Sequence, residues 1–140
     1  MEPQKDFWTD AEVISTYTRR QAIEDGVLVD LMQEELIDLV ADAGFKFPVA
    51  MTAEAFGDYV ALTPAAKRAC NDIKGRLWDV LYMLAAEIRK AQRRGNTDTT
   101  IFKFYCVTER VRPTLCTLKA VCGPGDTGEP VITIMHPWQD

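Results

Sequence analysis

Hydrophobic residues recur at helical spacing in two long stretches of the chain. Between residues 73 and 94 the apolar positions fall three or four apart, as on one face of an amphipathic helix. This stripe consists of Leu77, Leu81, Leu84 and Ile88. Residues 31–43 show similar spacing, with acidic residues on the opposite face and Gly44 directly after the stretch. We therefore expect amphipathic helices at both positions, the second of them ended by its glycine.

Shorter helices are predicted by the residues that begin them. Thr18 and Gln21 have the spacing of a capping box, in which each side chain accepts a hydrogen bond from the backbone amide of the other residue. Thr52 is suited to cap a helix that follows it, as is Thr63, which precedes Pro64. Proline is favoured at the first helical position because its missing amide proton is not needed there. Three short helices are therefore expected after these threonines.

The apolar pattern changes to alternation in the last third of the chain. It predicts strands over residues 101–107, 115–122 and 131–135. Residues 123–130 are rich in glycine and proline, so this segment must reverse the chain direction between the last two strands. We therefore predict an α+β fold in which N-terminal helices pack on a small C-terminal antiparallel β-meander.

The length of 140 residues is typical of one domain. Residues 1–12 carry several charges and no apolar period, so we expect a flexible N-terminal arm followed by a single α+β domain over residues 13–140. No stretch approaches the roughly 18 consecutive apolar residues that can span a bilayer. The first residues also lack the apolar run of a signal peptide. These features predict a cytoplasmic protein without a membrane partner.

Charge is unevenly distributed along this acidic chain, whose net charge is −5. Residues 1–64 hold 13 acidic and 4 basic residues, a balance of −9, whereas residues 65–140 hold 8 acidic and 12 basic residues, a balance of +4. Six acidic residues lie close together in the first half: Asp25, Asp30, Glu34, Glu35, Asp38 and Asp42. Such a surface can imitate nucleic-acid phosphates and bind a basic channel of another protein. An ordinary solvated face explains the same pattern.

The sequence holds few residues suited to catalysis or metal binding. His136 is the single histidine, which excludes a two-histidine metal site, and we expect it to be a surface group. None of the four cysteines forms a C-x-x-C pair, and Cys116 and Cys122 lie too far apart on one predicted strand to share a zinc ion. A nucleophile pair of His136 with Cys106 or Cys122 stays open. We therefore expect no metal and no cofactor, and a protein without catalytic activity is favoured over an enzyme.

One alternative is an enzyme related to ADP-ribosyltransferases. Tyr17 and Thr18, followed by a short helix and Gly26, resemble the opening strand and helix of that family. The resemblance would require a catalytic glutamate on a late strand, for which Glu109 and Glu129 are the candidates. The capping box at the start of the helix and the glycine at its end explain the same residues without an active site.

Another alternative is a nucleic-acid-binding regulator. Residues 67–94 contain eight basic side chains that could contact phosphates. They do not form one stripe, and cations near a helix C-terminus are explained by the helix dipole. Direct nucleic-acid binding is therefore the weaker expectation.

Four blocks of the sequence resemble one known family. They comprise residues 17–30, residues 43–50, residues 75–81, and residues 121–126 with 129–135, and together they span most of the chain. The chain resembles a family of uncharacterised small bacterial proteins carried on plasmids, phages and other mobile elements. The family has no established activity. Small acidic proteins in that setting often bind and inhibit a restriction or CRISPR complex.

The blocks are mostly apolar, so few of their residues are candidates for binding. The exposed polar candidates are Arg76, Asp79, Asp126 and Glu129. Arg76 and Asp79 stand three apart on the predicted long helix, so they could form a pair with each other instead.

The resemblance and the acidic first half together imply a function. We expect a non-catalytic protein-interaction module from a mobile element, an inhibitor of a host defence complex of the anti-CRISPR or antirestriction type, acting through an acidic surface. Its partner would be a host protein or ribonucleoprotein complex. A homodimer formed through the edge of the sheet is also compatible with the sequence.

Overall fold

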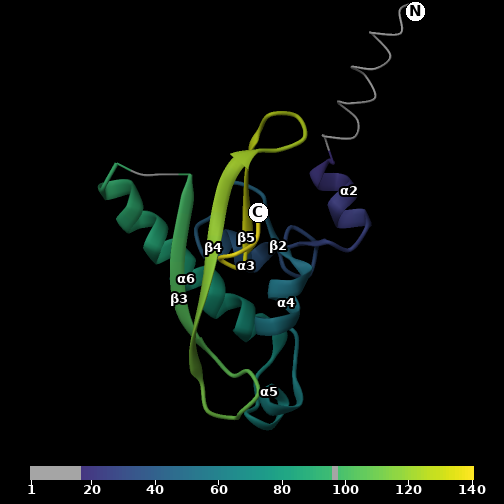
Figure 1. Ribbon diagram of the computed structural model, residues 1–140, viewed down its shortest axis with the longest axis vertical. Helices are drawn as coiled ribbons and strands as arrows, with labels where there is room; N and C mark the ends of the chain where they lie inside the picture. Colours follow the sequence, from purple (N-terminus) through teal and green to yellow (C-terminus); the bar gives the residue numbers. More distant parts are fainter. Residues whose placement is uncertain (1–16, 96–97) are drawn as a thin grey trace, which may run out of the picture.

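A five-stranded mixed sheet forms the centre of the molecule in the computed structural model, which describes residues 17–95 and 98–140 (Figure 1). The arm expected at residues 1–12 lies outside the described residues. The strands are β1 (Leu28–Asp30), β2 (Val49–Thr52), β3 (Thr99–Cys106), β4 (Thr114–Pro124) and β5 (Pro130–Met135). The helices are α2 (Arg19–Glu24), α3 (Ile37–Asp42), α4 (Ala53–Tyr59), α5 (Pro64–Arg68) and α6 (Ile73–Arg93).

The predicted fold class was wrong in how the sheet is assembled. Strands β3, β4 and β5 form the expected antiparallel meander. Strand β2, however, pairs in parallel with β5, with Val49 opposite Ile132, and β1 adds an antiparallel strand beyond β2. The sheet order is therefore β1-β2-β5-β4-β3, and the N-terminal half supplies two strands. The result is a mixed α/β fold and not a set of N-terminal helices packed on a C-terminal meander.

The three threonine caps predicted from the sequence are confirmed. Thr18 and Gln21 form both hydrogen bonds of the capping box at the start of α2. The Thr52 hydroxyl accepts from the third residue of α4, and the Thr63 hydroxyl does the same for α5, where Pro64 is the first helical residue. These signals act over three residues, so the local sequence alone determines them.

The helix predicted over residues 31–43 is much shorter than expected. Only Ile37–Asp42 is helical, and residues 31–36 form turns. The Asp30 carboxylate accepts a hydrogen bond from the Met32 amide at 2.9 Å, which fixes a turn where the helix was expected to begin. Leu36 precedes α3 and makes no side-chain cap. The apolar spacing of this stretch places Leu36 and Val40 in the core without a continuous helix.

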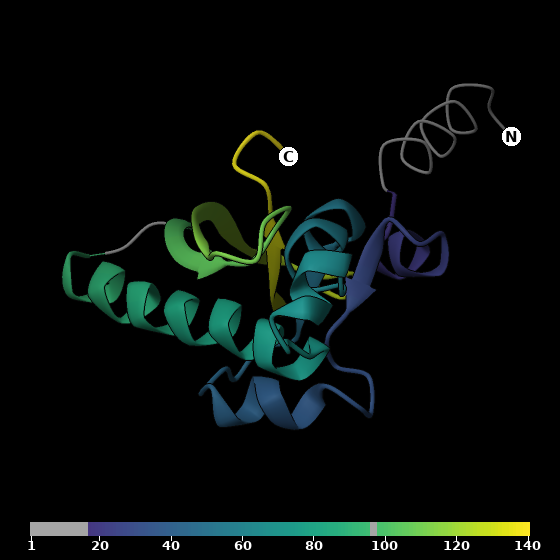
Figure 2. The same cartoon turned by 90° about the horizontal axis from the view of Figure 1, so that it is seen from below.

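Helix α6 covers one face of the sheet and contributes Leu77, Val80, Leu81 and Leu84 to the core. Figure 2 shows α6 and α3 on the same side of the strands, with α2 at the β1 end of the molecule. Leu77, Leu81 and Leu84 of α6 are fully buried, as the stripe predicted, and they join Phe102 and Phe104 in one apolar cluster. Within the part of the chain that the structure describes, no helix is long and apolar enough to cross a membrane.

Candidate functional site

Four of the six predicted acidic residues lie together on an exposed segment. We call residues 33–42 the acidic segment; it comprises the turn before α3 and α3 itself. Its carboxylates are Glu34, Glu35, Asp38 and Asp42, and all four are exposed. Across residues 17–95 and 98–140, none of the four makes a salt bridge or a side-chain hydrogen bond. Their charges are therefore directed to solvent and available to a partner.

The other two acidic residues have partners inside the molecule. The Tyr17 hydroxyl donates a hydrogen bond to the Asp25 carboxylate at 2.5 Å, and this bond raises the pKa of Tyr17 above its ordinary value. The Asp30 carboxylate accepts a hydrogen bond from the Met32 amide, as described above. These two carboxylates support local structure, so the acidic segment is the part of the predicted surface without internal partners.

Asp126 joins the β4–β5 loop to the first turn of α2. Its two carboxylate oxygens accept hydrogen bonds from the backbone amides of Arg19 at 2.8 Å and Arg20 at 3.0 Å. The Arg19 guanidinium in turn donates to the Thr133 hydroxyl at 2.6 Å and to the Ile132 carbonyl at 2.8 Å. Asp126 was expected to face a partner, but it satisfies helix amides that would otherwise lack an acceptor.

Glu129 is also used within the β4–β5 loop. Its carboxylate accepts a hydrogen bond from the Thr127 hydroxyl, and its backbone carbonyl accepts one from the Gly125 amide at 2.6 Å. Desolvation lowers the pKa of Arg19, and the nearby charges of Asp126 and Glu129 oppose that shift. The loop therefore supplies acceptors for the first two amides of α2, beside the capping box at Thr18, and negative charge near a half-buried guanidinium.

Arg76 is buried and connects three elements of the fold. Its Nε donates to the Val60 carbonyl at 3.1 Å, and one terminal nitrogen donates to the Val107 carbonyl at 2.8 Å and to the Asn71 side-chain oxygen at 3.2 Å. The other terminal nitrogen is buried without a hydrogen-bond partner in the described structure. Arg76 thus holds the start of α6 against the ends of α4 and β3, which is a structural role.

Asp79 does not form the expected pair with Arg76. Within the described residues, no salt bridge joins the two side chains. Asp79 instead lies at the rim of a surface hollow of about 300 Å³, which it shares with Trp78, Tyr82 and Tyr105. Partial desolvation raises the pKa of the Asp79 carboxyl, and the positive charge of Arg76 opposes the shift.

His136 is not the surface group that the sequence suggested, because only 1% of it is exposed. Its Nε2 lies 2.8 Å from an Asp58 carboxylate oxygen. The Trp138 ring stacks on the imidazole with centroids 4.3 Å apart and planes at 7°, and the Tyr59 ring meets it edge-on at 5.4 Å. The residues after β5 therefore turn back and place the imidazole against α4.

The Gln139 side chain ties this turn to α4. Its oxygen accepts hydrogen bonds from the Thr52 hydroxyl at 2.9 Å and from the His136 amide at 2.8 Å. Its nitrogen donates to the Glu54 carboxylate at 3.0 Å. Glu54, Asp58 and His136 consequently form a polar cluster, with one possible ligand atom from each residue within 4.8 Å of the others. Sequence reasoning missed the cluster because 78 positions separate Asp58 from His136.

The candidates for enzymatic chemistry have other roles in this structure. The Cys106 thiol donates to the Tyr59 carbonyl at 3.4 Å and not to His136, and burial raises its pKa to about 11. A thiol with that pKa stays protonated at neutral pH, which does not suit a nucleophile. The Thr18 hydroxyl of the ADP-ribosyltransferase-like segment is engaged in the cap of α2.

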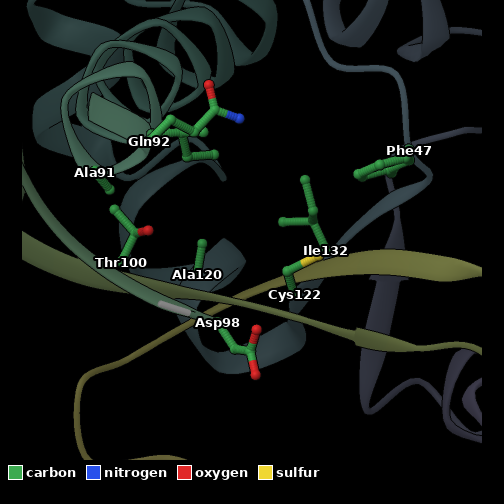
Figure 3. A pocket seen from close by; sticks show the side chains of 9 residues that line it. Phe47, Ala91, Gln92, Asp98, Thr100, Ala120, Cys122 and Ile132 are labelled. Carbon is green, nitrogen blue, oxygen red and sulfur yellow. The ribbon is translucent and has the colours of Figure 1, made fainter. Parts of the chain in front are cut away.

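A small apolar pocket lies between the second half of α6 and the sheet. Figure 3 shows Phe47, Ile132 and Ala120 around this space, with the Gln92 amide and the Cys122 thiol at its border. The volume is about 130 Å³, below the roughly 300–1,000 Å³ of pockets that enclose drug-sized ligands. The pocket therefore fits at most a very small apolar molecule.

Of the eight basic residues between 67 and 94, Arg76 is buried and the other seven are exposed.

Comparison with known proteins identifies a family without an assigned activity. A family model described as a family of unknown function, DUF6573, matches residues 4–140. Neither the curated proteins nor the solved structures contain a significant match to the chain. The comparison confirms the expected resemblance to an uncharacterised family.

Proposed function

The chain belongs to the DUF6573 family, and we propose that it is a non-catalytic interaction module that docks on a basic surface of another protein through the acidic segment. One observation carries this proposal. Four exposed carboxylates stand within nine residues, and none of them has a salt bridge or side-chain hydrogen bond in the described structure. A surface of one sign attracts a partner of the opposite sign and accelerates its association.

The acidic segment is also held firmly enough to present its charges in one arrangement. Leu36 and Val40 of this segment are buried in the main core, beside residues of α6. Ile37 lies between the carboxylates and is 38% exposed, so it offers an apolar contact at the centre of the charged surface. A rigid surface loses less conformational entropy on binding than a flexible one.

The family setting suggests what the partner is. We propose that a bacterial mobile element encodes the protein and that it acts in the cytoplasm. There it would be an inhibitor of the anti-CRISPR or antirestriction type, directed against a host defence complex. Such complexes bind nucleic acid through basic channels, and carboxylates spaced along an exposed segment can occupy sites meant for phosphates. The partner would therefore be a host protein or ribonucleoprotein complex with a basic groove.

A comparative capture experiment tests the acidic segment. The tagged protein is incubated with bacterial lysate at low salt, and bound proteins are identified by mass spectrometry. The same is done with the fourfold variant Glu34→Lys, Glu35→Lys, Asp38→Lys, Asp42→Lys. A matched fourfold control carries Glu24→Lys, Glu87→Lys, Glu109→Lys and Asp140→Lys, which makes the same change in net charge outside the segment.

We expect one partner to be retained by the unmodified chain and the control but lost from the acidic-segment variant, with affinity reduced by at least about a hundredfold. Affinity of the unmodified chain should fall as salt concentration rises. Equal retention by both variants would reject the acidic segment as the contact surface. Circular dichroism of each variant shows whether the fold is preserved.

A further inference from the structure

Helix α4 and the turn after β5 bring three potential metal ligands together. Glu54 and Asp58 lie four positions apart on the same face of α4, and His136 approaches them from the far end of the chain. One ligand atom from each residue lies within 4.8 Å of the other two. Ligand atoms bound to one zinc ion at about 2.0–2.2 Å are separated by roughly 3–4 Å. The His136 Nε2 and the Asp58 oxygen lie 2.8 Å apart, so an ion would replace the proton shared between them and move the two atoms slightly apart. Rotation of the exposed Glu54 side chain would bring the third ligand atom to the same spacing.

No lysine or arginine of the described residues balances the two carboxylates of this cluster. Glu54 and Asp58 are both exposed carboxylates, and neither forms a salt bridge with a lysine or arginine in the part of the chain that the structure describes. Two negative charges at this separation repel each other. A divalent cation between them would remove the repulsion and provide the missing positive charge.

The aromatic rings of Trp138 and Tyr59 orient the imidazole toward the carboxylates. Trp138 stacks on one side of the ring and Tyr59 meets it edge-on, so the ring plane is fixed. Nδ1 is buried and has no hydrogen-bond partner among the described residues, which leaves Nε2 as the only polar contact of the ring. Gln139 donates to Glu54 and orients that carboxylate, in the way that outer hydrogen bonds orient ligands in metal sites.

We propose that Glu54, Asp58 and His136 bind a divalent transition-metal ion of the Zn²⁺ class. One imidazole nitrogen and two carboxylate oxygens suit this class, whereas Mg²⁺ and Ca²⁺ prefer oxygen ligands alone. Three protein ligands leave a coordination position for water or an anionic group. Of the three ligands, Asp58 also lines a surface hollow of about 570 Å³ between α4 and α5. This site is independent of the acidic segment.

Isothermal titration of the full chain with ZnCl₂, and the absorption spectrum of the Co²⁺-loaded chain, test the site. We expect saturable binding of one ion per chain, and visible absorption bands from Co²⁺ bound by protein ligands. Glu54→Gln and Asp58→Asn should each weaken Zn²⁺ binding by at least about tenfold. These variants keep the size of the side chain and its ability to form hydrogen bonds, so circular dichroism should show an unchanged fold.

Two matched controls separate this site from other sources of binding. Asp42→Asn removes a carboxylate of the acidic segment, and Cys70→Ser removes the exposed thiol, so neither should change the affinity. The proposal is overturned if Zn²⁺ does not bind at millimolar concentration, if Glu54→Gln and Asp58→Asn bind as well as the unmodified chain, or if either control abolishes binding. In the first case the Asp58–His136 bond is structural only.

Discussion

Asp126 caps the helix that begins at Arg19, although 107 positions separate the two residues: a carboxylate oxygen of Asp126 lies 2.8 Å from the Arg19 amide nitrogen. Its second oxygen accepts from the Arg20 amide. A helix of six residues has few internal hydrogen bonds, so it depends on partners at its ends. The β4–β5 loop supplies that partner and thereby fixes α2 against the sheet.

Replacing Asp126 by alanine should therefore destabilise the protein. The expected loss is about 1–2 kcal/mol, because two helix amides lose a charged acceptor. Asp126→Asn keeps one acceptor oxygen and should lose less. Urea denaturation measures both values, and Glu109→Ala, an exposed acidic residue in another loop, is the control. Equal midpoints for Asp126→Ala and Glu109→Ala would contradict the capping role.

Arg76 should be more costly to replace than any exposed base. Arg76→Ala leaves the buried carbonyls of Val60 and Val107 without their donor, at about 1–3 kcal/mol each. Arg76→Lys should recover only part of the loss, because a single ammonium group cannot reach both carbonyls in the way the planar guanidinium does. The neighbouring Lys74→Ala should change the free energy of unfolding by about 0.5 kcal/mol at most. Thermal and urea unfolding measure these losses. An equal loss of free energy for Lys74→Ala and Arg76→Ala would contradict the structural role of Arg76.

The four cysteines should differ strongly in reactivity. Cys70 is exposed, whereas Cys106 is buried with its pKa raised from 9.0 to about 11. Iodoacetamide at pH 8 should modify Cys70 first, and Cys106 should react only as the pH approaches about 11, as measured by peptide mass mapping. In the unfolded chain the Cys106 thiol ionises near pH 9, before it does so in the folded chain. This residue therefore reduces stability as the pH rises from 9 towards 11. Rapid labelling of Cys106 at pH 8 in the folded protein would show that it is not protected.

Strand β3 is an open edge of the sheet, and Lys103 lies at its middle. The Cys122 amide donates to the Asp98 carbonyl, and along β3 the backbone groups of successive residues then point alternately toward β4 and away from it. Ile101, Lys103 and Tyr105 therefore direct their backbone groups away from β4. Lysine on an edge strand disfavours pairing with another chain. Lys103→Val should promote self-association, seen as a larger mass in size-exclusion chromatography with light scattering. Lys119→Val, on the interior strand β4, should leave the mass unchanged; the same mass for both variants would argue against an open edge.

Local signals in the sequence predicted the starts of the capped helices better than the pairing order of the sheet. The caps at Thr18, Thr52 and Thr63 could be recognised because each involves residues three positions apart. Strand β2 gave no such signal, since it has four residues and all four are buried, which removes the alternation typical of a strand with one exposed face. Its parallel partner β5 lies in the last part of the chain, so no local pattern could indicate the pairing.

The same distinction applies to the candidate residues. Glu34 and Asp38 are exposed as predicted, because they lie opposite the apolar positions of their own segment. Asp126 is exposed as predicted, but its carboxylate is already used by the Arg19 amide, 107 positions away in the sequence. His136 was predicted to lie on the surface because it stands next to Pro137, and only the folded chain shows that Asp58 and Trp138 enclose it.

The position of β5 between β2 and β4 has a consequence for how the chain is made. During synthesis on the ribosome, β2 and β4 are both complete before the strand that joins them exists. Each must hold an unpaired inner edge until residue 135 has been added, and unpaired edges of this kind can attach to other chains. The complete sheet therefore forms only after β5 has been synthesised, and until then pairing with other chains competes with folding.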